Sequence, residues 1–438
     1  MLGAGAIRRS GERRGGAKTG TRSRARVAGL SMVGVAALIT ASLSAGAVGA
    51  GTAGAAAASA ETPDAATQSP VTIGMITDGG GSSSIGTAAL VEQGAKAAVS
   101  YLNAYGGGLA GHKVTLYICE NQSTPSGGQT CANDMVQHGV VAVVEPFTGQ
   151  GATEVPTIVG AGIPYIVVSG GSTAELTTTG AYDLEGGFPA YLGAMALSAK
   201  AHGLKKVTFL VENVPAAIQG AQVFGAMVYK AAGVGFSVVP VNEGTADISP
   251  QMQSAVSGGA DAVGMVGDVT LCTSFLRAYS TLGLKLPRYV LSTCQDSSIL
   301  NSPTLDKTLT GSYITTSTAS SAADNAQYAF MMKKYAPKVS PNPNVSSNQA
   351  DGVTPVLALG SIMKGSTQPV TAGGVNAATA AATNVTIPLS GGLTFTCNGK
   401  AIPLLKSVCS ASAAIGVVQS GKSGKVTSVR VYNPTPLF

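Results

Sequence analysis

The sequence has few of the side chains that most often carry catalysis. Only three His occur in 438 residues, charged residues make up 11% of the chain, and Trp is absent. Nucleophilic catalysis needs a nucleophile, a base and an orienting group. His112, His138 and His202 stand in a Gly-rich turn and at two helix ends, where surface residues are expected, and no G-x-S-x-G motif occurs. We therefore expect no enzyme.

The motifs of cofactor and metal sites are also missing. Gly79 and Gly81 follow the first expected strand, but a G-x-G-x-x-G fingerprint would need Gly at position 84, which is Ser. No Cys pair has the C-x2-C spacing of a zinc site, and the three His are far from the Cys in sequence. We expect neither a nucleotide cofactor nor a metal.

Basic residues are scarce beyond the first 26 positions. Residues 1–26 hold eight Arg or Lys and one Glu, whereas the rest of the chain has 19 basic and 20 acidic residues. The formal net charge of +6 therefore comes from the N-terminal segment. A basic surface for nucleic acid is not supported.

An uncharged stretch, residues 27–60, follows the basic segment and is most apolar at residues 30–39. It ends in Ala58-Ser59-Ala60. This order is typical of a secretory signal peptide, which we predict over residues 1–60. Cleavage after Ala50 is an alternative, and so is an uncleaved membrane anchor. No Cys precedes Cys119, so the sequence offers no acylation site of a bacterial lipoprotein.

The six Cys fall into three local pairs. An even number of Cys in an exported chain indicates disulfides. Sequential pairing is one of fifteen possible connectivities, and the spacing favours it. Buried free thiols are the alternative for the middle pair. The predicted disulfides are Cys119–Cys131, Cys272–Cys294 and Cys397–Cys409.

Short apolar strands alternate with helical segments in two successive blocks of the chain. Alternation at this spacing is typical of parallel sheets with crossover helices. We predict an α/β fold with two Rossmann-like lobes, each with a parallel central sheet, joined by a hinge. The expected strands are residues 71–77, 113–118, 140–144 and 165–168 in the first block, and 206–211, 236–241, 262–266 and 289–291 in the second.

The domain assignment follows from these blocks. Residues 61–70 are Pro-, Thr- and Ala-rich and are expected to form a flexible leader. We assign residues 71–188 and 312–395 to the first lobe, and residues 189–311 and 396–438 to the second. The last of these segments is expected to be β-rich, with strands at 413–418 and 426–431.

A small, hydroxyl-rich turn follows the expected strand at 165–168. It reads Ser169-Gly170-Gly171-Ser172-Thr173. Small polar ligands dock at the carboxyl ends of strands in open α/β sheets. Glycines let the backbone approach a ligand, and hydroxyls can donate or accept. We therefore predict ligand contacts from Gly170, Gly171, Ser172 and Thr173. An N-cap at Ser172 or Thr173 is the alternative.

Polar residues at other expected strand ends complete the candidate site. Two facing sets would form a cleft for a small zwitterion or amide. Each acid can instead cap the helix that follows it, where the macrodipole favours negative charge. We prefer this interpretation for Glu120, Glu212 and Glu243 and leave both open for Asp268. The further ligand-binding candidates are Thr148, Gly149, Asp268 and Gln295.

Several motifs, in order, resemble one known family. They are Ile73-Gly-Met-Ile-Thr-Asp-Gly, Gln93-Gly-Ala-Lys-Ala-Ala, Leu102-Asn-Ala-Tyr-Gly-Gly-Gly-Leu-Ala-Gly-His-Lys-Val and Phe275-Leu-Arg-Ala-Tyr-Ser-Thr-Leu-Gly-Leu. Over residues 71–360 the chain is similar to ABC-transporter solute-binding proteins of the leucine/isoleucine/valine-binding type, which have the type I periplasmic-binding-protein fold.

The resemblance implies where an amino acid would bind. In the family, the loop matching residues 147–151 and the turn matching Gly171-Ser172 hold the α-amino and α-carboxylate groups. The chain departs from the pattern elsewhere. Asp268-Val269 replaces an aromatic residue found in some members, and the acid that often holds the ammonium group has no clear match near residues 293–295.

Together these features predict an exported, monomeric binding protein that captures a small polar metabolite, an amino acid or an amide-like compound. It would lie outside the membrane, in the extracellular, cell-wall or periplasmic space. The resemblance implies that the closed state is recognised by an ABC permease. The alternatives are an exported ligand-sensing subunit for a membrane receptor and a hydrolase.

Overall fold

The computed structural model describes residues 62–79, 85–316, 321–337, 348–419 and 425–438. The predicted signal peptide, residues 1–60, lies outside these ranges. No helix within them is long and apolar enough to cross a bilayer.

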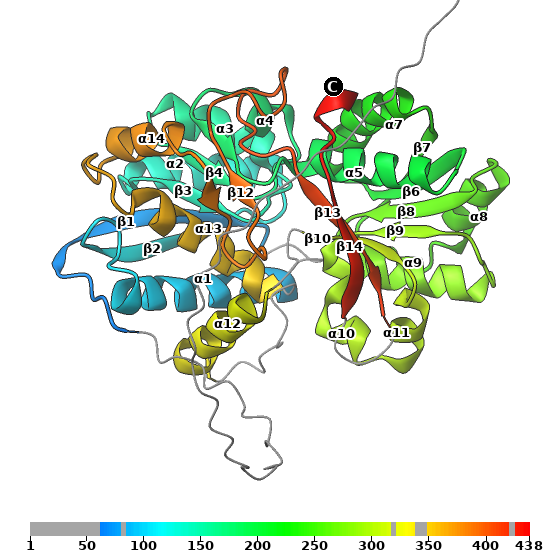
Figure 1. The fold of residues 1–438 in the computed structure, drawn as a ribbon, viewed down its shortest axis with the longest axis horizontal. Helices are drawn as coiled ribbons and strands as arrows, with labels where there is room; N and C mark the ends of the chain where they lie inside the picture. The colour runs from blue at the N-terminus through cyan, green and yellow to red at the C-terminus, as the bar shows by residue number, and fades with distance from the viewer. Residues whose placement is uncertain (1–61, 80–84, 317–320, 338–347, 420–424) are drawn as a thin grey trace, which may run out of the picture. The chain divides into compact units, whose positions relative to one another are not determined.

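The first lobe is built on a five-stranded, wholly parallel sheet (Figure 1). Alternate residues of its strands enter two cores. Ile166 packs with helices of residues 85–105, 322–335, 348–363 and 372–380 on one face, whereas Tyr165 and Val167 pack with helices of residues 125–137 and 151–160 on the other. This period of two is expected for a strand buried on both faces. The strands, in sheet order, are β2 (His112–Glu120), β1 (Gln68–Thr77), β3 (Val143–Glu145), β4 (Tyr165–Val167) and β5 (Ala181–Asp183).

The helices of the first lobe come from two separate parts of the chain. The short α4 (Thr173–Thr177) follows β4. The others are α1 (Ile85–Tyr105), α2 (Pro125–Gln137), α3 (Gly151–Gly160), α12 (Ala322–Tyr335), α13 (Asn348–Met363) and α14 (Ala372–Ala380). A two-stranded sheet of β11 (Val385–Thr386) and β12 (Thr394–Phe395) follows α14.

The second lobe is built on a seven-stranded sheet in which five strands are parallel and two, β13 and β14, are antiparallel additions at one edge. Figure 1 shows β13 and β14 beside β10. The strands, in sheet order, are β14 (Val426–Tyr432), β13 (Ala413–Val418), β10 (Tyr313–Thr316), β9 (Arg288–Val290), β8 (Ala262–Val266), β6 (Lys206–Glu212) and β7 (Gly235–Val241).

Helices cover both faces of the second sheet as well. Val207, Phe209 and Val211 of β6 enter one core with α5 and α7, and Leu210 enters the other with α8 and α9. A π-helical stretch at Gly220–Gly225 joins α6 to α7. The helices are α5 (Gly187–Ala201), α6 (Pro215–Gln219), α7 (Ala226–Ala232), α8 (Ser249–Ser257), α9 (Val269–Thr281), α10 (Ser297–Leu300) and α11 (Pro303–Leu309), with 3-10 turns at Ser292–Gln295 and Thr435–Leu437.

Two glycines allow α1 and α13 to approach closely. A Cβ atom on Gly94 would lie 1.8 Å from the carbonyl oxygen of Gln349, and one on Gly352 would lie 1.9 Å from that of Val91. Since real Cβ atoms do not approach an oxygen this closely, only Gly fits at either position. This contact holds the late segment of the chain against the first lobe.

The three sequential disulfides are present. Cys119–Cys131 links β2 to α2, Cys272–Cys294 links α9 to the 3-10 turn after β9, and Cys397–Cys409 closes a loop after β12. No Cys in the described chain is free.

Three expected boundaries differ from the structure. Residues 61–70 were expected to be a flexible leader, but β1 begins at Gln68, and the amide of Ala66 donates to the carbonyl of Asn103. Residue 312 was expected to open a first-lobe segment, yet β10 pairs with β9 and β13 in the second sheet. A strand carries no local signal of the sheet to which it belongs, because pairing is a long-range property.

The third difference concerns residues 396–412, which were assigned to the second lobe. Asp183 of β5 exchanges backbone hydrogen bonds with this segment, since its amide donates to Ser407 and its carbonyl accepts from Cys409. Cys397 and Cys409 are buried in a first-lobe core. The chain therefore returns to the second sheet only at β13.

Candidate functional site

A cavity of about 240 Å³ lies at the carboxyl ends of the strands of both sheets. Strand ends of two facing α/β sheets are a common place for a small-ligand site. The first lobe contributes residues after β1, β2, β3, β4 and β5, and the second contributes residues after β6, β7, β8 and β9. The polar lining residues with carboxyl groups are Asp78, Glu185, Glu212, Glu243, Asp268 and Asp351.

Asp78 ties three strand ends of the first lobe together. Its Oδ1 accepts from Asn121 Nδ2 at 2.7 Å and from Thr148 Oγ1 at 3.1 Å, and its Oδ2 accepts from the amide of Gly149 at 2.8 Å. Burial raises the pKa of Asp78, against these three hydrogen bonds. The carboxyl group fixes the loop that carries Gly149 along the cavity.

A cluster of buried carboxyl groups lies behind this loop. The hydroxyl of Tyr165 is 2.9 Å from Glu145 Oε2, 3.4 Å from Glu154 Oε2 and 3.5 Å from Glu175 Oε1. All three Glu are fully buried. Asn121 Nδ2 donates to Glu154 Oε1 at 2.9 Å, which connects the cluster to Asp78.

The cluster holds its protons more tightly than exposed carboxyl groups do. Burial raises the pKa of Glu154 to about 8 and that of Glu175 to about 6, and burial followed by the charge of Glu154 raises the pKa of Glu145. None of the causes is a nearby cation. The cluster is therefore held together by shared protons and neutral donors.

Aromatic and aliphatic side chains form much of the wall. Phe147 and Phe188 lie with ring centroids 5.9 Å apart, and both line the cavity. Tyr191 donates its hydroxyl to Glu185 Oε2 at 2.5 Å, and burial raises the pKa of Tyr191. Most of the volume is therefore bounded by hydrocarbon, with polar groups at defined points.

The second lobe places two carboxyl groups side by side. Glu212 ends β6 and is 7% exposed, and its Oε2 accepts from the amide of Asp268 at 3.0 Å. Asp268 is the N-cap of α9, where its Oδ1 accepts from the amide of Leu271 at 2.8 Å. Burial and then the neighbouring Asp268 raise the pKa of Glu212 to about 8, and burial raises the pKa of Asp268.

The loop after β9 completes this side of the cavity. Ser292 and Thr293 line it, and Thr293 Oγ1 donates to the carbonyl of Gly267 at 3.0 Å. The disulfide Cys272–Cys294 joins α9, which follows the loop of Gly267, to the 3-10 turn that contains Thr293, with Cα atoms 5.6 Å apart and both Cys buried. The hydrogen bond and the disulfide together restrict the conformations of these two segments.

Asp351 comes from α13, near the helix start. Its carboxyl group lines the cavity and forms no hydrogen bond within the described chain. Burial raises its pKa to about 7.

The predicted ligand residues fall into three groups. Gly149 and Asp268 line the cavity. Thr148 and Gln295 are buried, at 0% and 2% exposure, and are not among the lining residues. Gly170, Gly171, Ser172 and Thr173 are outside the lining, although Ser169, the first residue of their turn, belongs to it.

Ser172 has the role that we gave as the alternative. It is the N-cap of α4, its Oγ accepts from the amide of Glu175, and Glu175 Oε2 accepts from the amides of Gly171 and Ser172. This is a capping box. Thr173 is exposed, and its amide donates to Gln219 Oε1.

Several lining residues are not among the ligand-binding residues predicted from the sequence. Glu212 was interpreted as a helix cap, but its carboxylate accepts from the amide of Asp268 in a neighbouring strand loop. Glu185 follows β5, a strand of three residues that was not predicted. Asp351 and Tyr191 lie inside helices, and nothing in the local sequence distinguishes them. The position of Glu185 five residues after Gly180 was a weak available signal.

No group of three or more His, Cys, Asp or Glu is arranged to hold a metal ion in the part of the chain that the structure describes.

The chain is similar in fold to several solved structures, and each match covers nearly the whole length of the solved chain. A leucine-binding protein from Thermotoga maritima is 17% identical, with 83% of this chain and 99% of that chain covered and a TM-score of 0.66. A fatty acid ABC transporter substrate-binding protein from Thermomonospora curvata is 13% identical, with 86% and 96% covered and a TM-score of 0.69. A solute-binding protein from R. palustris in complex with 4-hydroxybenzoate is 16% identical, with 84% and 98% covered and a TM-score of 0.67.

No curated protein sequence matches the chain. The family model described as periplasmic binding protein matches residues 70–405. The two α/β lobes and the fold of the leucine-binding neighbours agree with that match. The chain belongs to the periplasmic binding protein family and has the type I fold of its leucine/isoleucine/valine-binding members.

Proposed function

We propose that the protein is an exported solute-binding protein that captures a small polar metabolite in the cavity and delivers it to an ABC importer. The observation that carries this proposal is the lining itself, since the carboxyl ends of both sheets contribute to one cavity of about 240 Å³. A ligand that contacts both lobes stabilises the state in which both contacts are made. A permease that recognises that state would sense occupancy.

The ligand class is the finer part of the proposal. The sequence predicts an amino acid or an amide-like compound, and relatives of the same fold include proteins with leucine, fatty acid and 4-hydroxybenzoate in their descriptions. The cavity lies below the range usual for drug-sized ligands, which favours a small metabolite. The protein would release that metabolite unchanged and perform no chemistry on it.

The test has two steps. The full-length chain is screened by thermal shift against a library of small metabolites, because binding to the native state raises the melting temperature. Each compound that binds is then recovered and weighed by mass spectrometry. We expect a saturable, unmodified ligand, whose uptake falls in cells lacking the protein. Recovery of a chemically converted compound would show that the protein is an enzyme. Unchanged uptake in cells lacking the protein would show that it binds the compound without serving its transport.

A further inference from the structure

The charged side chains among the described lining residues of the cavity are all acidic. Six of its lining residues carry carboxyl groups, and no Lys, Arg or His stands among the lining residues within the described ranges. A site for a carboxylate ligand would need a cation or a set of free donors facing it. The acids here would repel such a group.

Two lining carboxyl groups of the first lobe, those of Asp78 and Glu185, are supplied with neutral donors. Asp78 accepts from Asn121, Thr148 and Gly149, and Glu185 accepts from Tyr191. These hydrogen bonds partly compensate the negative charge of Asp78 and Glu185. The two carboxyl groups therefore stabilise the structure of the lobe.

The carboxyl groups of Glu212 and Asp351 differ, because hydrogen bonding within the described chain leaves part or all of each one unused. Glu212 is 7% exposed, yet only its Oε2 accepts a hydrogen bond within the described chain. Asp351 accepts none. Neither of these two carboxyl groups, nor that of Asp268, forms an ion pair with a Lys, Arg or His within the described ranges. A buried carboxylate without a cation is costly, and an adjacent like charge adds to that cost.

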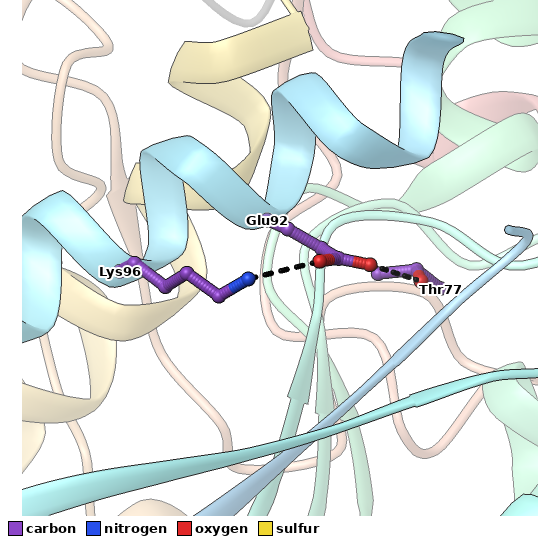
Figure 2. A network of polar contacts seen from close by, with 3 residues as sticks. All are labelled: Thr77, Glu92 and Lys96. Atoms are coloured by element: carbon purple, nitrogen blue, oxygen red, sulfur yellow. Dashed lines mark hydrogen bonds and ion pairs between the residues drawn. The ribbon is translucent and has the colours of Figure 1, made fainter. Parts of the chain in front are cut away.

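Glu92 shows what a partnered carboxylate looks like in the same protein. Its Oε2 lies 3.0 Å from Nζ of Lys96, one turn along α1, and its Oε1 accepts from Thr77 Oγ1 at 3.4 Å (Figure 2). Both oxygens are therefore occupied, and one of them faces a cation. Glu92 is not among the lining residues, so it provides a matched control.

The walls specify the rest of the ligand. Phe147, Phe188 and Leu291 line the cavity together with several aliphatic side chains. They favour a hydrocarbon body, and the aromatic faces can also attract a cation. The elevated pKa values of Glu212 and Asp351 have the same cause, since burial without a cation disfavours the charged form.

We propose that the ligand is a small amphipathic amine of net positive charge, with its ammonium group held by Glu212 and Asp268 and its hydrocarbon body against Phe147, Phe188 and Leu291. The ammonium group supplies the cation that these carboxylates lack. This inference rests on the proposed function. It differs from the amino acid expected from the family resemblance, because it excludes a free carboxylate on the ligand.

The test compares ligands that share a hydrocarbon body and differ in the charge of the polar head group. Two series are titrated into the full-length chain: phenethylamine, phenylalanine, 2-phenylethanol and 3-phenylpropionate, and pentylamine, norleucine, pentanol and hexanoate. The metabolite library is run beside them, with calcium and magnesium as separate additions. We expect the amines and the cationic members of the library to raise the melting temperature, and the anions to have no effect.

Substitutions of single carboxyl groups test where the ammonium group of the ligand is held. Glu212→Gln should weaken amine binding about ten- to a hundredfold, because it replaces a charge-assisted hydrogen bond to the ammonium group by a neutral one. Asp268→Asn should do the same while the protein keeps its melting temperature, since Asn can still cap α9. Glu92→Gln should bind as the wild type does.

Each other outcome overturns a defined claim. Binding of only zwitterionic, neutral or anionic compounds, or of only a divalent metal, would overturn the charge assignment and leave the capture of a solute intact. Amine binding that Glu212→Gln and Asp268→Asn leave unchanged would overturn the placement of the ammonium group. If no compound binds, the proposed function itself fails.

Discussion

The amide of Asp268 donates to Oε2 of Glu212 at 3.0 Å, which joins the loop after β8 to the end of β6. The contact brings two carboxyl groups to the same side of the cavity, and burial holds the pKa of both above the usual range. Neighbouring strands make this possible, because β6 and β8 pair in register up to Val211 and Val266. The arrangement is stable when a proton or a cation compensates the charge.

The buried carboxyl cluster makes stability depend on pH. The pKa of Glu154 is about 8 in the folded protein and near 4.5 when unfolded, and that of Glu175 is raised to about 6. The folded state therefore binds more protons across this interval. Its stabilising contribution is complete below about pH 4.5 and is lost as the pH rises through 6 and then 8.

We expect the melting temperature to fall between pH 5 and pH 8 at constant ionic strength. Glu154→Gln should flatten this dependence, since Gln cannot ionise. A control variant at the partnered Glu92, Glu92→Gln, should keep the wild-type slope. A melting temperature that rises over this interval would contradict the description of the cluster.

Substitution at the α1–α13 contact should be costly. Gly352→Ala places a methyl group 1.9 Å from the carbonyl oxygen of Val91, so the helices must separate. Overpacking of this kind costs about 1–3 kcal/mol. Gly373→Ala is the matched control, because a Cβ on Gly373, within α14, meets nothing within 4 Å. Urea denaturation should show a loss for the first and a gain of about 0.4–1 kcal/mol for the second.

Ser172→Ala tests whether the turn after β4 binds ligand or supports α4. The hydroxyl caps α4 and is fully buried, away from the lining. We expect a loss of about 1 kcal/mol in stability. Affinity for the ligand, measured by calorimetry, should stay within about twofold. A tenfold loss of affinity with unchanged stability would restore the ligand contact that the sequence suggested.

The disulfide Cys272–Cys294 should contribute substantially to stability. It closes a loop with a sequence separation of 22 residues. In the chain-entropy model, such a bond stabilises the native state by about 3 kcal/mol. The double variant Cys272→Ala, Cys294→Ala should lose about that much in urea denaturation and bind ligand more weakly, because the loops carrying Asp268 and Thr293 are less restricted. Non-reducing peptide mapping of the wild type must show the cross-linked peptide.

The sequence predicts the elements and their order well because hydrophobic periodicity is local. The expected strand at 413–418 matches β13, and the expected strand at 262–266 matches β8. Partner choice is not local. The sequence therefore could not place β10 in the second sheet or residues 396–412 in the first lobe.

The candidate site shows the same limit. Gly149 and Asp268 were found because they follow strands and so stand at the ligand edge of a sheet. Ser172 follows a strand too, but the chain turns into α4 and uses its hydroxyl as a cap. Asp351 reaches the cavity from α13, far along the chain, and only the tertiary packing of that helix against α1 brings it there.

The central claim is that one small molecule occupies the cavity between the two sets of strand ends. Gly149→Leu tests it most directly, because Gly149 lines the cavity and a Cβ there meets only Asp78 Oδ2, at 3.4 Å. The added side chain would fill ligand space while the fold is kept. In calorimetric titration, the wild type should bind its ligand with one-to-one stoichiometry, and Gly149→Leu, with an unchanged melting temperature, should bind none. Equal binding by both proteins would contradict the account.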